Sequence, residues 1–434
     1  MSAHVPALAA GDAGGPRRAL LLAGGGMRVA YQAGALLALE EAGLRFTHAD
    51  GTSGGIFNLA MLLSGVTPAE ACERWRRLRP RGFATPPSLR VLAGGPPYPA
   101  WSSSDGLRRD VLPKLGVDPA RIRAAEGIAG TFNVCDFAAK AVVAVPHERI
   151  DLDTLIAGVS LPVFSPAVRR NGSTLMDAVW IRDVNVEEAI RRGAEELWLV
   201  WCIGNHGVYR DGAFQQYVHM IEIAANASLA AQLAGVPEDV TLRVIRPRVP
   251  LPLDPDYLLG RIDGASLVAM GYRDAAELLD NGSRVSPHDA SATRMSDPRP
   301  GIGLREHLRG DAGGTPLELR LDWELEDVGA TQGRIAGDAT HPALGVRQPA
   351  REGVFSVDGD RVRARLRFSG GTLTLERSLQ RWSEVEVDTG DARGRLRACG
   401  PPAALRVHAR GVGSAAAGAR TQLRFWTRWL RSGS

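Results

Sequence analysis

Three short segments of the chain carry residues that could together cleave an ester. The first, Gly51-Thr52-Ser53-Gly54-Gly55, is a G-x-S-x-G pattern just before a helical run that begins at Ile56. Such a pattern places a serine hydroxyl on a sharp strand-to-helix turn, where small glycines leave it open to a substrate carbonyl. The helix behind it offers free N–H groups and a positive dipole end to a developing oxyanion. Because the chain holds 50 glycines, this pattern alone is also compatible with a structural turn.

The second segment is Gly24-Gly25-Gly26-Met27-Arg28, between an apolar run and a long helical run. Three glycines allow successive backbone N–H groups to point at one negative oxygen. The spacing is not G-x-G-x-x-G and no G-K-[ST] follows, which argues against a dinucleotide loop and a P-loop. We expect Arg28 to brace this loop or to sense an anionic headgroup.

The third segment ends in Asp177, after an Asn171-Gly172 turn and a strand-like run. A carboxylate at a strand end can accept a hydrogen bond from a serine on a neighbouring turn. A histidine base is the alternative, because the order Ser53, Asp177, His206 also fits a Ser-His-Asp hydrolase. His48, His147 and His219 are further candidates. No metal-ligand spacing occurs, so we predict neither a metal nor another cofactor.

The elements that must position these residues form two patterns. Apolar strand-like runs alternate with helical runs from about residue 18 to 282, which predicts an α/β fold with a mostly parallel sheet. Residues 1–17 are expected to be a disordered tail, and the Ser-, Pro- and Gly-rich residues 283–316 a linker. From 317 to 434 apolar and polar residues alternate, as in Val362, Ala364, Leu366 and Phe368 between arginines, which predicts a small antiparallel β domain, a sandwich or a barrel.

Composition sets broad limits on the function. The 434 residues are 44% hydrophobic and 23% charged, as in an ordinary globular protein of two domains. Four cysteines without a C-x-x-C pair suggest neither a disulfide scaffold nor a zinc site. The net charge of +4 is dispersed, which does not indicate nucleic-acid binding. No apolar run reaches the ~18 residues that span a bilayer, and we expect a cytoplasmic protein.

The carboxyl-terminal segment predicts a basic amphipathic helix. Its arginines and aromatic residues include Arg420, Arg424, Trp426, Arg428 and Trp429. A helix of this composition can lie at a membrane surface, where anionic lipids strengthen its binding. The alternative is that its apolar side packs on the β domain.

Together, the order and spacing of the three segments resemble the patatin-like phospholipase family, in its bacterial branch. The resemblance covers roughly residues 18–280 and adds Ser160–Pro166 and Val184-Asn185-Val186 to the match. It implies a three-layer α/β/α sandwich and a lipid acyl hydrolase of the phospholipase A or lysophospholipase type. Ser53 would be the nucleophile and Asp177 its base. The implied oxyanion hole is Gly24, Gly25, Gly26 and Gly54, supported by Met27, Arg28, Gly51, Gly55 and Ala178. A Ser-His-Asp esterase using His206 and a non-catalytic lipid-binding protein remain the alternatives.

Overall fold

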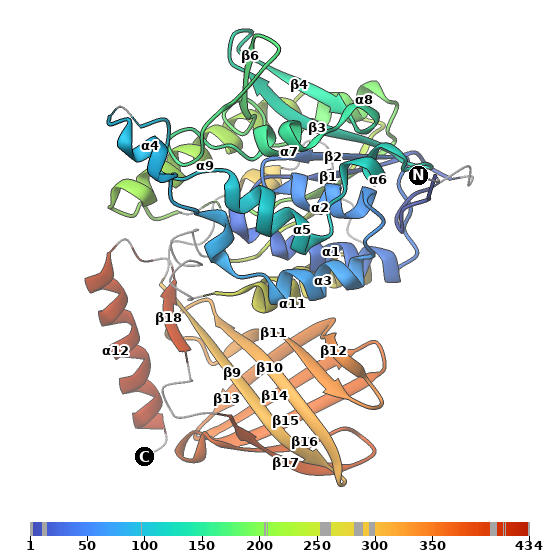
Figure 1. The fold of residues 1–434 in the computed structure, drawn as a ribbon. Helices are drawn as coiled ribbons and strands as arrows, with labels where there is room; N and C mark the ends of the chain where they lie inside the picture. The colour runs from blue at the N-terminus through green and yellow to red at the C-terminus, as the bar shows by residue number, and fades with distance from the viewer. Residues whose placement is uncertain are drawn as a thin grey trace.

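The chain forms two halves, an α/β half and a β-barrel half, in a computed structural model (Figure 1). It describes residues 3–10, 15–96, 98–203, 205, 207–251, 262–281, 290–294, 300–399, 406–410, 412 and 414–432. Helix α11 (Gly264–Asn281) lies between the two halves.

A mixed sheet of eight strands forms the centre of the α/β half. Its order is β5-β6-β3-β2-β1-β7-β8, and β4 pairs with β3. Strands β3, β2, β1, β7 and β8 run parallel to their neighbours in this order, whereas β4 and β6 are antiparallel to β3. The predicted, mostly parallel α/β sheet is therefore confirmed. The strands are β1 (Arg18–Leu22), β2 (His48–Thr52), β3 (Ala129–Asp136), β4 (Ala141–Pro146), β5 (Val168–Arg170), β6 (Ser173–Asp177), β7 (Glu196–Val200) and β8 (Thr241–Ile245).

Helices cover both faces of this sheet because β1 is apolar on both sides. Leu20 and Leu22 enter a core shared with α1, α2, α3 and α11, whereas Leu21 enters a second core with α8 and α9. The helices and short turns are η1 (Gly26–Val29), α1 (Ala30–Glu41), α2 (Gly55–Leu63), α3 (Pro68–Arg77), η2 (Pro80–Phe83), α4 (Leu89–Ala93), η3 (Leu107–Val111), α5 (Leu112–Leu115), α6 (Pro119–Arg123), η4 (His147–Arg149), α7 (Leu152–Gly158), α8 (Val186–Arg191), α9 (Ala213–Leu233) and η5 (Ala290–Thr293).

Eight antiparallel strands close into a barrel in the carboxyl-terminal half. The order runs β10-β11-β13-β14-β15-β16-β17-β9, and β9 pairs back to β10. Closure removes the exposed edges, and the predicted alternation places Val362 and Leu366 in the barrel core. The strands are β9 (Gly301–Ala312), β10 (Thr315–Leu325), β11 (Gln332–His341), β12 (Gly345–Pro349), β13 (Glu352–Asp358), β14 (Arg361–Phe368), β15 (Gly371–Ser378), β16 (Glu384–Asp388), β17 (Arg393–Ala398) and β18 (Arg406–Arg410), with η6 (Leu379–Arg381) and α12 (Ala415–Ser432).

Two expectations about irregular segments were wrong. Strand β9 occupies residues 301–312, which we assigned to the linker. A side chain at Gly310 would place its Cβ 2.0 Å from the Arg395 carbonyl, so close strand pairing rather than a loop requires this glycine. The expected tail 1–17 is also partly ordered, because His4 bridges to Ala125 and Leu8 is fully buried.

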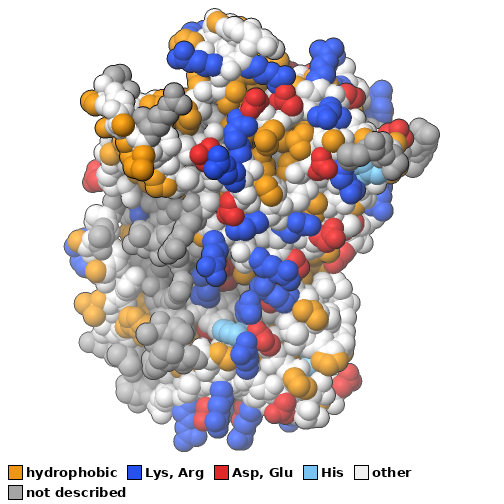
Figure 2. Space-filling model, viewed as in Figure 1, with side chains coloured by type: hydrophobic (Ala, Val, Ile, Leu, Met, Phe, Trp, Pro, Cys, Tyr) orange, Lys and Arg blue, Asp and Glu red, His pale blue; other side chains and the backbone are white. Residues whose placement is uncertain are grey.

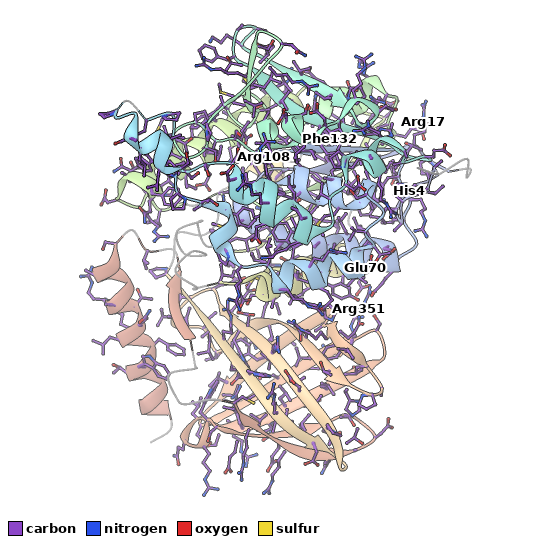
Figure 3. All side chains as sticks on the ribbon, in the orientation of Figure 1. His4, Arg17, Glu70, Arg108, Phe132 and Arg351 are labelled. Carbon is purple, nitrogen blue, oxygen red and sulfur yellow. The ribbon has the colours of Figure 1, made fainter. Side chains whose placement is uncertain are left out.

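Ion pairs join α11 to the barrel. Arg273 on α11 is buried at this junction. The barrel residue Arg351, which Figure 3 labels, lies where the barrel meets the α/β half. Three of these pairs are Arg273–Glu324 at 2.8 Å, Arg334–Asp274 at 3.1 Å and Arg351–Asp280 at 2.8 Å. Arg273, Asp274 and Glu324 are buried and need partners, whereas the Arg351–Asp280 pair lies at the more exposed edge of the same interface.

On its other side α11 contacts α1 at backbone distance. A Cβ at Gly271 would lie 1.8 Å from the Tyr31 carbonyl, and a Cβ at Gly34 would lie 1.9 Å from that of Val268. The Tyr31 hydroxyl donates to Asp274 over 3.0 Å. Helix α1, which follows the triple-glycine segment, is therefore held against the helix that carries the barrel.

Within the residues that the structure describes, no helix combines the length and apolar character needed to cross a bilayer.

Candidate active site

Ser53 sits at a tight turn between β2 and α2. Its φ is +50°, a left-handed conformation that a serine adopts only where the surrounding turn imposes it. Gly55, the first residue of α2, must lack a side chain because its Cβ would lie 2.0 Å from the Leu22 carbonyl. The turn is thus pressed against the end of β1, and Ser53 remains 5% exposed. This is the geometry expected of a nucleophile on a strand-to-helix elbow.

The triple-glycine loop lies directly on this elbow. Gly25 and Gly26 have φ values of +152° and +57°. A Cβ at Gly54 would lie 2.6 Å from the Gly26 carbonyl oxygen, and a Cβ at Gly24 would lie 2.9 Å from the Ser53 Cβ. Glycine is required at both positions because Gly54 meets the backbone of Gly26, and Gly24 meets the side chains of Ser53 and Asp183.

Free amides remain where these turns meet. In the described part of the chain, no acceptor takes the N–H groups of Gly25, Gly26 or Gly54. Arg28 is 4% exposed and its Nε donates to the Gly25 carbonyl over 2.9 Å, the contact expected of a residue that braces the loop. The loop is held with amides unused, as an oxyanion hole needs.

Asp177 ends β6 beside the serine. Its carboxyl is 1% exposed, and Oδ1 accepts from the Val179 amide at 2.9 Å. Burial raises the pKa of Asp177 to about 7, and the nearby Ser53 hydroxyl and the Val179 amide oppose this rise. Among the described residues no donor meets Asp177 Oδ2 with hydrogen-bond geometry. The serine is therefore close enough to act on the carboxyl's ionisation while one carboxyl oxygen stays open.

A second buried carboxyl, Asp183, was not predicted from the sequence. Its Oδ1 accepts from the Gly24 amide over 3.1 Å. Burial and the Asp177 carboxyl both raise the pKa of Asp183 well above its ordinary value. The Gly24 N–H is thus already used, so Gly24 is not a free oxyanion donor here, unlike the other three glycines assigned to that role.

A polar network under the elbow holds β2 in place. The Asp50 carboxylate accepts from Thr131 Oγ1 and Asn133 Nδ2, each at 2.8 Å, and from the Asn185 amide at 3.3 Å. Asn133 Nδ2 also reaches Thr52 Oγ1 at 2.9 Å, one residue before the serine. Burial raises the pKa of Asp50 to about 7. This network fixes the end of β2 from which the elbow rises.

The described histidines have partners elsewhere. His48 Nδ1 lies 2.8 Å from the Ala129 carbonyl, and burial lowers its pKa to about 4. His147 accepts from the Gly130 amide, and His219 lies 3.3 Å from Glu222. His206, the candidate triad base, falls outside the described residues.

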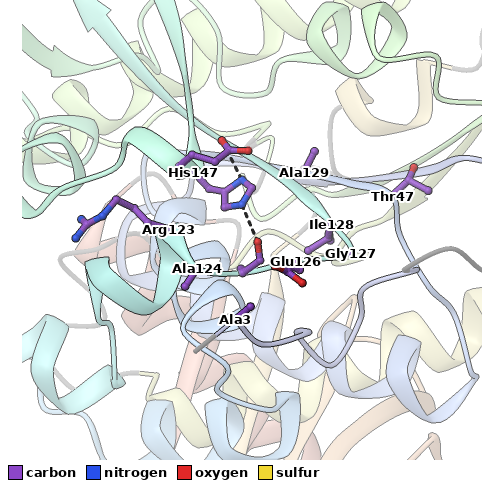
Figure 4. A pocket seen from close by; sticks show the side chains of 11 residues that line it. Ala3, Thr47, Arg123, Ala124, Glu126, Gly127, Ile128, Ala129 and His147 are labelled. Atoms are coloured by element: carbon purple, nitrogen blue, oxygen red, sulfur yellow. Dashed lines mark hydrogen bonds and ion pairs between the residues drawn. The ribbon is translucent and has the colours of Figure 1, made fainter. Parts of the chain in front are cut away.

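One cavity is well separated from this site. It has a volume of about 670 Å³ and is lined by Thr47, Ala129 and His147, among others (Figure 4). These residues surround the amino ends of β2 and β3, whereas Ser53 follows the carboxyl end of β2. The His147 ring fills its hydrogen bonds with backbone groups of Ala125 and Gly130, so this cavity offers no unused reactive group of that histidine.

In the part of the chain that the structure describes, no three His, Cys, Asp or Glu side chains gather so that they could hold a metal ion.

Comparisons with known proteins match the part of the chain that builds this site. The family model described as patatin-like phospholipase matches residues 20–190. Among solved structures, VipD from Legionella pneumophila is similar, with 13% identity and a TM-score of 0.32 over 61% of this chain and 67% of that chain. No curated protein sequence gives a significant match.

Proposed function

Because residues 20–190 are a patatin-like phospholipase domain, a family that implies a serine lipid acyl hydrolase, we propose that this protein cleaves carboxylic esters of lipids through Ser53 and Asp177. The observation that carries the proposal is the contact between the elbow and the triple-glycine loop. It brings a serine, a buried carboxyl and three unused amides into one small volume.

In the first half-reaction, Asp177 accepts the proton of Ser53 as the serine oxygen attacks the ester carbonyl. A carboxylate is normally too weak a base for this step, but a pKa of about 7 brings it closer to the ideal for catalysis at neutral pH. The amides of Gly25, Gly26 and Gly54 stabilise the oxyanion. One such donor contributes about 10²–10³ in rate.

The first half-reaction ends when the alcohol leaves with the proton that Asp177 holds and an acyl group remains on Ser53. In the second half-reaction water hydrolyses this acyl-enzyme. Asp177 then takes a proton from water, and the water oxygen attacks the acyl carbonyl. The serine oxygen leaves and regains its proton, which restores the starting state. Asp183 Oδ1 positions the Gly24 amide, and burial together with the Asp177 carboxyl disfavours a second negative charge at this site.

Covalent labelling with a fluorophosphonate probe tests the nucleophile. We expect labelling of the wild type and of the matched control Ser356→Ala on β13, and loss of labelling in Ser53→Ala. The lipid panel should include phospholipids, lysophospholipids and neutral esters, with Asp177→Asn as a second variant. A folded wild type whose Ser53 stays unlabelled would instead support a non-catalytic lipid-binding protein.

The replacement His206→Ala separates the two catalytic models. A Ser–Asp dyad retains most of its activity in this variant, whereas a Ser-His-Asp triad loses about 10⁴ or more in kcat. Collapse of activity in a folded His206→Ala protein would overturn the dyad.

We also propose that α12 contacts a membrane surface. Phe425 packs in the barrel core and is fully buried, which anchors the helix. Leu423 and Trp426 are 67% and 37% exposed, and Arg420 and Arg424 are exposed as well. The side chains of Arg428 and Trp429 lie outside the described residues. The predicted alternative, packing on the barrel, thus applies to one side of the helix, and the other side supports the membrane proposal.

Leu423→Glu should weaken binding to anionic vesicles.

A further inference from the structure

Helix α9 has a solvent-facing side without charge over its whole length. Its 21 residues contain one charged side chain, Glu222, and this residue is buried beside His219. The exposed side carries Gln216, Met220, Ile223 and Ala227, which we call the α9 face, together with further alanines. Met220 and Ile223 are 58% and 67% exposed. A surface helix normally turns charged residues to water, so about 30 Å of uncharged helix indicates an apolar contact.

An aromatic cluster connects the start of α9 to the catalytic pair. The centroid of the Phe164 ring lies 4.6 Å from that of Phe214 and 4.8 Å from that of Tyr217. The centroids of the Tyr217 and Trp180 rings lie 5.6 Å apart. Burial and the nearby Asp177 carboxyl raise the pKa of Tyr217. Trp180 follows Asp177 by three residues, so the cluster begins at the segment that carries the proposed base.

At its other end the same cluster reaches the surface. Trp101 is 64% exposed and its ring lies 5.3 Å from Phe164. Leu89 and Leu92 of α4 are also exposed. In Figure 1 α4 and α9 are drawn on the same side of the α/β half, and Figure 2, in the same view, shows hydrophobic side chains gathered on this side. Apolar and aromatic side chains thus run from Asp177 to a hydrophobic surface.

We propose that the α9 face docks on a lipid–water interface and delivers acyl chains along the aromatic cluster to Ser53. This inference rests on the proposed function and names the physical state of its substrate, an aggregated lipid. Lipid is the proposed occupant because α9 also carries Phe214 and Tyr217 of the aromatic cluster, which joins this helix to exposed Trp101 and to the segment of Asp177. Exposed Trp101 suits the boundary between headgroups and acyl chains.

The experiment measures partition of the protein onto vesicles of phosphatidylcholine and phosphatidylglycerol by sedimentation. All proteins carry Ser53→Ala, so no hydrolysis changes the vesicles. The variants are Met220→Glu and Ile223→Glu, and the matched control is Val346→Glu on the barrel, where the valine is 82% exposed. We expect Ile223→Glu to lower partition at least about tenfold, because a carboxylate replaces an apolar side chain that the lipid would cover. Val346→Glu should leave partition unchanged.

A second measurement uses the active enzyme with Ser53 restored. Ile223→Glu should retain hydrolysis of a monomeric short-chain ester and lose hydrolysis of vesicle lipid to the same extent as partition. Wild-type protein that does not bind vesicles, or Ile223→Glu that binds as the wild type does, would overturn the proposal. So would a wild-type dimer in sedimentation that Met220→Glu converts to a monomer, since the face would then contact a second copy. Vesicle partition is readable even if no ester is cleaved, so the two proposals fail separately.

Discussion

Replacement of Asp177 by Asn should stabilise the protein at the same time as it removes activity. The folded state holds this carboxyl with a pKa of about 7, against 3.8 in the unfolded chain. Because the folded state binds this proton more tightly, the carboxyl lowers stability progressively as pH rises from 3.8 to about 7. Above that range the penalty is constant, and below 3.8 it vanishes.

The magnitude follows from the difference between the two pKa values. About three pKa units at roughly 1.36 kcal/mol each give about 4 kcal/mol at pH 8, and the same relation gives about 2 kcal/mol at pH 5. Asparagine has no charge to desolvate and keeps an oxygen that can accept from the Val179 amide. The free energy of unfolding of Asp177→Asn should therefore exceed that of the wild type by these amounts.

Urea unfolding at pH 8 and pH 5 measures this gain, with Asp136→Asn on β3 as the matched control. Backbone amides lower the pKa of Asp136, so its replacement should give no gain. A variant no more stable than the wild type at pH 8, or a gain that does not shrink at pH 5, would refute the reasoning. Such a result would mean that burial does not raise the pKa of Asp177 in the folded protein.

Three further predictions concern the same elements. The hydrolysis rate, as kcat/KM, should fall about tenfold per pH unit below pH about 7 and level off above it, because Asp177 must be ionised to act as a base; a flat profile from pH 5 to 8 would contradict this role. Gly24→Ala should abolish ester hydrolysis, because its Cβ would lie 2.1 Å from Asp183 Oδ1, whereas Gly235→Ala, with its closest neighbour at 3.5 Å, should retain activity in the same assay. Arg273→Ala should lower the free energy of unfolding by about 3 kcal/mol or more, because it removes a buried positive charge that pairs with Asp274 in one half and Glu324 in the other, and an unchanged urea midpoint would show that these pairs do not hold the junction.

The elements with a regular pattern could be predicted from the sequence. Alternation at Val362, Ala364, Leu366 and Phe368 identified an antiparallel strand, because one face of β14 points into the barrel core. The apolar runs between residues 18 and 282 predicted buried strands, and β7 (Glu196–Val200) is such a strand, buried on both faces. The spacing of apolar residues along the sequence reflects which side chains are buried. It therefore identifies the elements in which buried side chains recur at a fixed spacing.

The supporting part of the site carried no such signal. Asp183 is a single acid in a loop, and only the fold shows that it meets Gly24. Asp50 looked like an ordinary residue of a short strand, because its partner Asn133 lies 83 residues away. Composition also misled at β9, where glycines that permit close strand pairing resemble those of a linker.

The carboxylates of α11 make the catalytic half depend on the barrel. Asp274 and Asp280 lie on the side of this helix that meets barrel arginines, and Tyr31 connects Asp274 to the helix that follows the glycine loop. A chain truncated after α11 would leave Asp280 without its barrel arginines and Arg273 without Glu324, and Asp274 would lose Arg334 and keep Arg273 of its own helix. Production of the α/β half alone would therefore require recoding α11 together with the cut.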